Sequence, residues 1–193
     1  MDQKVNRAST SEQILDLAQG LVQTRGYNAF SYADISSALG ITKASLHYHF
    51  KAKSDLGLSL ISRYENGFRH RLEEIEQQDG TAAERIRDYV AIYAGVLVDR
   101  RMCLCGMLAA EFETLPKSMQ SALDHFFDLN ERWLAAVLEQ GRKDGSLRFE
   151  GEPRELAEFL VASLEGAMML ARSHGADDRF HAAAKRLLAD IEV

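Results

Sequence analysis

Apolar residues recur at helical spacing along almost the whole chain, and only two of its 193 residues are prolines, Pro116 and Pro153. No segment of convincing length alternates with the two-residue period of a strand, and capping residues or stop glycines separate the apolar segments. The sequence therefore predicts an all-α fold. The predicted caps include Ser31, Thr42, Ser54 and Thr81, and the predicted helices span residues 10–25, 32–39, 43–50, 54–77, 82–99, 102–114, 116–143, 153–174 and 177–193.

The chain has the composition of an ordered globular protein, with 46% hydrophobic and 27% charged residues. Its longest uncharged stretch, residues 89–98, is far shorter than the roughly 20 apolar residues of a membrane-spanning helix. The first residues, MDQKVNRASTSEQ, lack the apolar run of a secretory signal. We therefore expect a cytoplasmic protein with no membrane partner, in which Cys103 and Cys105 are reduced.

Two short predicted helices flank Gly40, Ile41 and Thr42, which is the spacing of a helix-turn-helix unit. Glycine permits the positive φ of a sharp turn, and the apolar residues of both helices are expected to pack the pair onto helix 10–25. The polar residues of the second helix then remain outward: Lys43, Ser45, His47, Tyr48 and His49.

The charge of this region differs from that of the whole chain. Residues 25–53 carry four basic side chains and one acidic side chain, although the chain has a net charge of −6. A polar helix with basic neighbours fits the major groove of DNA, where short side chains reach base edges and cations contact phosphates. The alternative, a helical hairpin inside a bundle core, fits so many polar residues less well.

The segment 26–56, GYNAFSYADISSALGITKASLHYHFKAKSDL, resembles the DNA-binding domain of the tetracycline-repressor (TetR) family of transcriptional regulators. It has GY, a serine before the short helix, ADI, ALGI, the threonine cap and His-Phe at the family's spacing. The resemblance implies a helix-turn-helix DNA-binding domain over residues 1–53 and a larger helical domain for effector binding and dimerisation over residues 54–193. It also implies a homodimer, usually a repressor, that binds a palindromic DNA operator and is released by a small effector.

The resemblance further implies a set of DNA contacts. The start of the recognition helix enters the major groove, and its end and the following lysine lie on or near phosphates. His47 departs from the family, which commonly has tyrosine there, so an imidazole nitrogen is expected to take over that phosphate contact. The implied contact residues are Ser31, Thr42, Lys43, Ala44, Ser45, His47, Tyr48, His49 and Lys53.

Aromatic and methionine residues at helical spacing supply the core of the larger domain, and most are expected to be plain core. A cavity among them is expected to take a small hydrophobic or electrophilic effector. The candidate residues for this site are Tyr64, Phe68, Tyr93, Cys103, Met107 and Phe127.

The last two predicted helices are apolar over a wide face that includes Phe159, Leu160 and Leu164. We expect this face to form the interface of a two-fold homodimer. The alternative is that the same residues form the monomer's own core.

Cys103 and Cys105 fall in the predicted helix 102–114, where residues two apart point about 200° away from each other. Two such thiols share neither a metal ion nor a disulfide, so no metal site and no cofactor are predicted. The local pattern resembles the N-ethylmaleimide-reductase repressor branch of the family, in which the cysteine at the position of Cys103 senses electrophiles and oxidants. Two interpretations stay open: a thiol sensor whose pKa is lowered by Arg100 or Arg101, or a buried, inert cysteine.

The sequence argues against an enzyme. It has no Gly-x-Ser-x-Gly elbow, no phosphate-binding glycine loop and no His-Glu-x-x-His motif, and Glu111 and Glu113 serve equally well as solvated or capping residues. A small helical enzyme is therefore a remote alternative. A DNA-binding protein of purely structural role is a third class, disfavoured by the large apolar domain.

Overall fold

The computed structural model describes residues 9–98 and 100–191. Within these ranges the chain is built from α-helices, as predicted, and none of them is long and apolar enough to cross a membrane. The helices are α1 (Thr10–Arg25), α2 (Tyr32–Leu39), α3 (Lys43–His49), α4 (Lys53–Gln77), α5 (Ala82–Leu97), α6 (Leu104–Ala109), α7 (Lys117–Asp144), α8 (Pro153–His174) and α9 (Asp178–Ala189), with a 3-10 turn at Phe112–Thr114.

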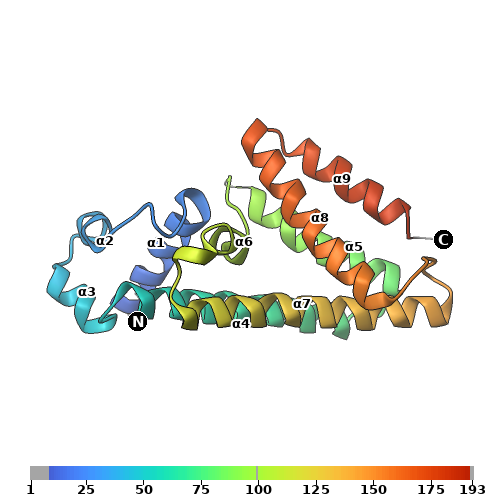
Figure 1. Cartoon of the computed structure of the whole chain (residues 1–193), viewed down its shortest axis with the longest axis horizontal. Helices are drawn as coiled ribbons and strands as arrows, with labels where there is room; N and C mark the ends of the chain where they lie inside the picture. Colours follow the sequence, from blue (N-terminus) through green and yellow to red (C-terminus); the bar gives the residue numbers. More distant parts are fainter. Residues whose placement is uncertain (1–8, 99, 192–193) are drawn as a thin grey trace, which may run out of the picture.

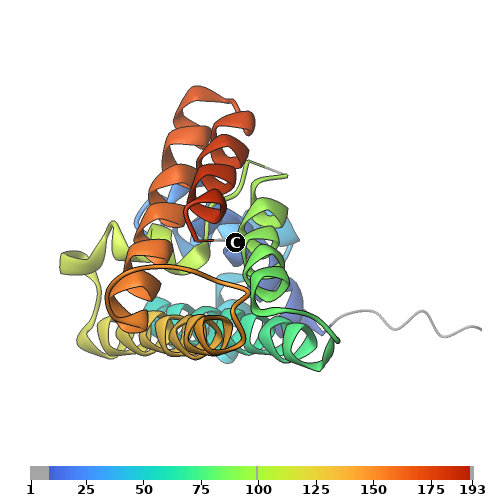
Figure 2. The same cartoon turned by 90° about the vertical axis from the view of Figure 1, so that its right-hand side faces the viewer.

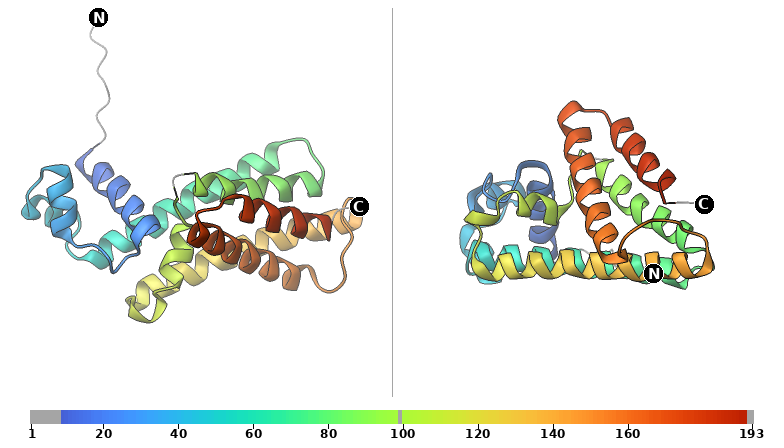
Figure 3. Two further views of the ribbon diagram at one scale, coloured as in Figure 1. Left: turned by 90° about the horizontal axis from the view of Figure 1, so that it is seen from above. Right: turned by 45° about the vertical axis from the view of Figure 1, so that its right-hand side comes forward.

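The first three helices form a small unit at one end of the molecule, from which α4 runs along the body beside α7 (Figure 1). Seen along the body, α8 and α9 lie next to each other above the layer of α4 and α7 (Figure 2). The views from above and at 45° show α5 alongside α8 and α9, and α6 at the end of the bundle next to the small unit (Figure 3). The larger unit is therefore a helical bundle that α4 joins to the smaller one.

Two predicted helix starts are wrong. Helix α4 begins at Lys53, because the carboxylate of Asp55 accepts a hydrogen bond from the backbone N–H of Ala52 at 2.9 Å, so Ser54 lies inside the first turn and is not the cap. The predicted helix 102–114 is two pieces, and Cys103 precedes the first of them as its N-cap, its sulfur accepting from the N–H of Gly106 at 3.4 Å. The helical spacing assumed for the two cysteines therefore does not apply.

Smaller differences concern helix ends. The fifth helix ends at Leu97 and the ninth at Ala189, and their predicted ends, residues 99 and 193, lie outside the described residues. The seventh helix runs to Asp144 and is stopped by Gly145 in the left-handed conformation.

The core of the bundle contains a buried polar cluster of Tyr89, Tyr93 and Asn130. The hydroxyl of Tyr89 donates to Oδ1 of Asn130 at 3.1 Å, and Nδ2 of Asn130 donates to the carbonyl of Phe126 at 2.8 Å. Tyr89 also contacts the hydroxyl of Tyr93 at 3.2 Å. These bonds satisfy polar groups that would otherwise be buried without partners.

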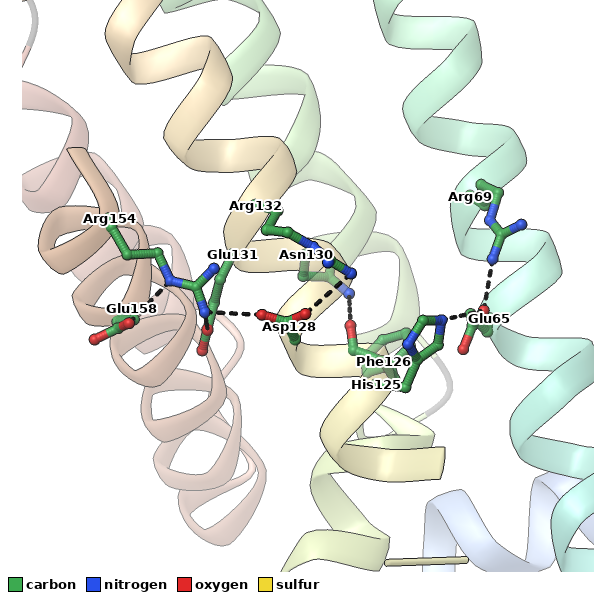
Figure 4. A network of polar contacts seen from close by, with 10 residues as sticks. All are labelled: Glu65, Arg69, His125, Phe126, Asp128, Asn130, Glu131, Arg132, Arg154 and Glu158. Atoms are coloured by element: carbon green, nitrogen blue, oxygen red, sulfur yellow. Dashed lines mark hydrogen bonds and ion pairs between the residues drawn. The ribbon is translucent and has the colours of Figure 1, made fainter. Parts of the chain in front are cut away.

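An ionic network crosses the outside of the bundle (Figure 4). Arg154 at the start of α8 pairs with Asp128 and Glu131 of α7 at 3.0 and 2.7 Å, and Glu65 of α4 lies 3.7 Å from His125 of α7. The cationic partners are exposed to solvent while Glu65 and Glu131 are partly buried, so each pair contributes only modestly to stability as it links α8 or α4 to α7.

Helix α8 is apolar on two sides, as its sequence indicates. Leu160 and Leu164 are buried within the single chain, whereas Phe159 and Leu170 are each 57% exposed and Met169 is 55% exposed. The prediction that Leu164 faces a second subunit is therefore wrong, because this residue belongs to the monomer's own core. The apolar residues of α8 that remain available for contact with a second subunit are the exposed ones, Phe159, Met169 and Leu170.

Candidate DNA interface and ligand pocket

The helix-turn-helix unit is held by a turn and a shared core. Gly40 adopts the left-handed conformation at φ 66°, which stops α2 and redirects the chain into α3. Ile35 of α2 and Leu46 of α3 are fully buried with Ile14 and Ala18 of α1. These contacts leave the opposite face of α3 open.

The predicted groove residues lie together on this open face. Thr42 caps α3 by accepting a hydrogen bond from the N–H of Ser45 at 3.1 Å. Lys43, Ala44 and His47 are exposed, and Tyr48 is 84% exposed, which is far more than an aromatic side chain of a folded core would be. Ser45 and His49 are only half-buried.

Tyr32 fixes the end of α3 from the start of α2. Its hydroxyl shares its one hydrogen between the carbonyls of Phe50 and Ala52, at 3.0 and 2.7 Å, and its ring centre lies 4.9 Å from that of His47. Nδ1 of His47 in turn lies 3.0 Å from the carbonyl of Lys51. The imidazole ring of His47, at the position where the family commonly has tyrosine, is therefore held in one orientation.

Ser31 is exposed and precedes α2 as its N-cap. Its N–H and its hydroxyl both donate to Oδ2 of Asp34, at 2.6 and 2.7 Å. The hydroxyl bond is the main reason that the pKa of the Asp34 carboxyl lies below its usual range. The predicted capping pair is confirmed, and the hydroxyl of Ser31 is engaged with Asp34 in this state.

The structure does not support the phosphate contact expected for Lys53. Its Nζ donates to the carbonyls of Tyr27, at 2.6 Å, and Phe30, and lies 4.5 and 4.3 Å from the centres of their rings. Partial burial lowers the pKa of this lysine. Its ammonium group therefore points inward and joins α4 to the segment between α1 and α2.

The larger domain contains an apolar pocket of about 510 Å³. It lies among α6, α7 and α8, and its lining residues are Met102, Gly106, Met107, Ala109, Ala110, Phe127, Glu165, Met169, Arg172 and Ser173. Two of the predicted effector residues, Met107 and Phe127, belong to it. A mostly apolar cavity with a few polar groups is typical of a small-molecule site.

The other aromatic candidates do not line this pocket. Phe68 and Tyr93 are buried in an aromatic cluster, with ring centres 6.2 Å apart, and Tyr64 lies 5.7 Å from Phe126 at its edge. Tyr64 and Phe68 line a separate cavity of about 300 Å³ beside α1, and Tyr93 is buried in the core, so contact of these three residues with an effector stays a prediction.

Glu165 is a functional candidate that sequence reasoning missed. Both carboxylate oxygens are buried, and no nitrogen or oxygen donor of the described residues bonds to either, so that the thiol of Cys103 is the one weak donor that interacts with them. Burial raises the pKa of this carboxyl to about 7. The signal was present in the sequence, since Glu165 is the one charged residue between positions 159 and 171.

Cys103 and Cys105 are both buried, and neither lines the pocket. Burial, and next the charge of Glu165, raises the pKa of both thiols well above the usual range. The predicted lowering of the Cys103 pKa by Arg100 or Arg101 is therefore wrong. A protonated, buried thiol is a poor nucleophile, which weighs against the thiol-sensor alternative.

Arg172 connects the pocket to the smaller domain. From α8 its guanidinium donates to the carbonyl of Gln23 at 3.4 Å and to that of Thr24, at the end of α1. The side chain of Gln23 is itself buried and donates to the carbonyl of Met102, another pocket residue, at 3.0 Å. The end of α1 is thus hydrogen-bonded to two residues of the pocket wall.

An outward recognition helix on a compact helix-turn-helix unit, joined to a helical bundle with an apolar pocket, defines a ligand-responsive class of DNA-binding regulator. Residues 14–60 match the family model described as bacterial regulatory proteins of the tetR family, and residues 82–187 match the tetracyclin repressor-like C-terminal domain. The chain belongs to the TetR family and is a transcriptional regulator, not an enzyme.

Several relatives cover nearly the whole chain. A TetR-family regulator from Agrobacterium tumefaciens is 37% identical, with 95% of this chain and 97% of that one aligned and a TM-score of 0.92. A TetR regulator from Legionella pneumophila is 34% identical over 97% and 100% of the two chains, with a TM-score of 0.89. The transcriptional repressor NemR of Escherichia coli K12 is 28% identical over 84% of each chain.

Proposed function

We propose that this regulator represses transcription by binding a palindromic DNA operator as a homodimer, and that a small ligand in the pocket releases it. The proposal divides the chain into a DNA-binding domain over residues 1–53 and an effector-binding and dimerisation domain over residues 54–193. The exposed face of α3 supports the DNA contact, and the exposed apolar side chains of α8 support the dimer. Two relatives are named as transcriptional repressors, NemR and DhaR, which supports repression rather than activation.

The observation that carries the proposal is the bond from Arg172 to the end of α1. A ligand that enters the pocket shares space with this side chain and with Met102, so it displaces groups that hold α1 in place. Because α1 forms one core with α2 and α3, a shift of α1 moves the recognition helix. Two such helices must reach successive major grooves, about 34 Å apart, so a small rotation in each subunit releases the operator.

The test is to select the operator from random duplex DNA and to compare wild type with the variant Arg172→Ala. The variant lacks the bond to α1 in the same way as the liganded protein, so its operator affinity should fall by about tenfold, equivalent to about 1.4 kcal/mol. Arg186→Ala, which removes an exposed arginine of α9, is the matched control and should bind as wild type does. Full operator affinity in Arg172→Ala would contradict the proposed coupling, and failure of wild type to select any sequence would contradict operator binding itself.

A further inference from the structure

The carboxylate of Glu165 is buried in the larger domain with no nitrogen or oxygen donor bonded to either of its oxygens. It lies at the pocket wall against Gly106, where a Cβ atom would be only 2.2 Å from Oε2, so glycine at position 106 makes room for it. The nearest titratable neighbours are the buried thiols of Cys103 and Cys105 and the hydroxyls of the core tyrosines. No cation pairs with this carboxylate in the described part of the chain.

The second charged residue of the pocket differs in this respect. The guanidinium of Arg172 already donates to two backbone carbonyls and to the sulfur of Met107 at 3.2 Å. Its positive charge is therefore engaged by acceptors of the protein, whereas the negative charge of Glu165 is not. A buried carboxylate whose one neighbouring donor is a weakly donating thiol is destabilising, and a bound group that supplies both a strong donor and a positive charge removes that penalty.

We propose that the pocket selects amphipathic primary amines: the ammonium group donates to the carboxylate of Glu165, and an apolar body fills the rest of the cavity. Glu165 and Arg172 are seven residues apart on α8, which places them on the same face about two turns, or roughly 10 Å, from each other. The hydrocarbon body of a ligand held at Glu165 therefore extends toward Met169 and Arg172. This inference rests on the proposed function, because it names the class of effector for the same pocket.

The lining fits such a body. Three methionines contribute flexible, polarisable side chains, and Phe127 contributes a ring, so the cavity adapts to linear as well as cyclic hydrocarbons. A carboxylate ligand would bring a second negative charge next to Glu165 and is disfavoured. An alcohol of the same length fills the same space but forms no ion pair.

The experiment measures binding of octylamine, octanol and octanoate to the full-length protein by isothermal titration calorimetry at about pH 8, where the amine is protonated and Glu165 is mostly ionised. We expect wild type to bind octylamine at least about tenfold more tightly than octanol, and octanoate most weakly. Glu165→Gln should lose the preference for the amine and bind octylamine and octanol alike. Glu155→Gln, which removes the same charge from an exposed position of α8, should keep the preference.

The outcomes separate the two proposals. Equal or tighter binding of octanol or octanoate by wild type overturns the inference, and so does an undiminished amine preference in Glu165→Gln. The wild-type series decides the matter even if that variant does not fold. Operator release is measured separately. Release by octanoate but not by octylamine refutes the amine class and leaves the proposed function standing. Binding of octylamine without release of the operator supports the amine class and contradicts the proposed function.

Discussion

Lys51 and Lys53 carry the same charge at the same end of the DNA-binding domain, yet their surroundings differ. Lys51 is exposed at the end of α3, beside His47. Lys53 is turned inward, between the rings of Tyr27 and Phe30. The sequence predicted that Lys53 lies next to DNA. Sequence spacing does not give the direction of a long, flexible side chain, so it did not show that Lys53 points inward while Lys51 faces solvent.

The first prediction compares Lys53→Ala with Lys51→Ala. Loss of Lys53 removes charged hydrogen bonds and two cation–π contacts, so the free energy of unfolding should fall by about 1–3 kcal/mol. Loss of Lys51 should leave stability unchanged and reduce the slope of log affinity against log salt by about 0.9 for each phosphate that the protein no longer neutralises. Thermal unfolding and operator titrations at several salt concentrations measure both effects. A reduced salt slope in a fully stable Lys53→Ala protein would restore the phosphate role to Lys53.

Glu165 also makes stability depend on pH. Its pKa is about 7 in the folded protein against an ordinary value of 4.5, so the folded state holds the proton more tightly than the unfolded state. Stability from this group is therefore fully present below about pH 4.5 and is lost as pH rises through 7. The facing thiols and tyrosine hydroxyls have raised pKa values and do not titrate in this window.

The second prediction follows from this sign. Between pH 5 and 8 the free energy of unfolding of wild type should fall by roughly 2–3 kcal/mol because Glu165 ionises, and Glu165→Gln should not show this fall. The variant should therefore be more stable than wild type at pH 8 and similar to it at pH 5. Denaturant unfolding at both pH values measures the difference. A variant with the same pH dependence as wild type would show that Glu165 is ionised at low pH or is not buried in solution.

At the scale of elements, the helices of the small domain were predictable because their signals are local. The turn at Gly40 and the caps at Ser31 and Thr42 each depend on residues within three positions of one another. The region after α5 was not predictable in the same way. Cys103 leaves the helix because the neighbouring backbone is held from elsewhere: the N–H of Met102 donates to the carbonyl of Gln23, 79 residues earlier, at 3.1 Å.

The junction after α1 shows how closely the two domains are fitted. Gly26 has φ 99°, and a Cβ atom there would lie 2.4 Å from Oε1 of Glu111. Oε2 of Glu111 accepts a hydrogen bond from the N–H of Asn28 at 3.0 Å. A side chain at position 26 is therefore opposed both by the backbone conformation and by a residue of the other domain.

The third prediction is that Gly26→Ala destabilises the protein by about 1–3 kcal/mol and weakens operator binding, because the strained backbone and the displaced Glu111 both shift the end of α1. Gly20→Ala is the matched control: this glycine lies inside α1, and a Cβ atom there would have no neighbour within 4 Å. The control should gain about 0.5–1 kcal/mol, since alanine favours a helix interior. Equal stabilities for the two variants, measured by chemical unfolding, would contradict this account of the junction.

At the scale of the whole molecule, the wide apolar circumference of α8 serves two purposes. Its sequence indicated that the helix has more apolar surface than packing on one side requires, but helical spacing did not show which residues belong to which side. The fold assigns Leu164 to the monomer's core and leaves Phe159 and Leu170 exposed. Which apolar residues of α8 are buried depends on where α7 and α9 pack against it. These are long-range contacts, so the sequence of α8 alone does not reveal them.

The last prediction distinguishes the two sides of α8 by placing the same residue on each. Phe159→Arg puts a charge on the exposed side, so the protein should stay folded while its dimerisation weakens roughly 100-fold, as expected when an aromatic anchor worth about 2–4 kcal/mol is lost from an interface. Leu164→Arg buries an unpaired charge in the monomer and should destabilise the fold by more than about 3 kcal/mol. Analytical ultracentrifugation reports the first effect, and circular dichroism during thermal unfolding reports the second. A folded monomer from Leu164→Arg, or an intact dimer from Phe159→Arg, would mean that the two subunits meet through another face.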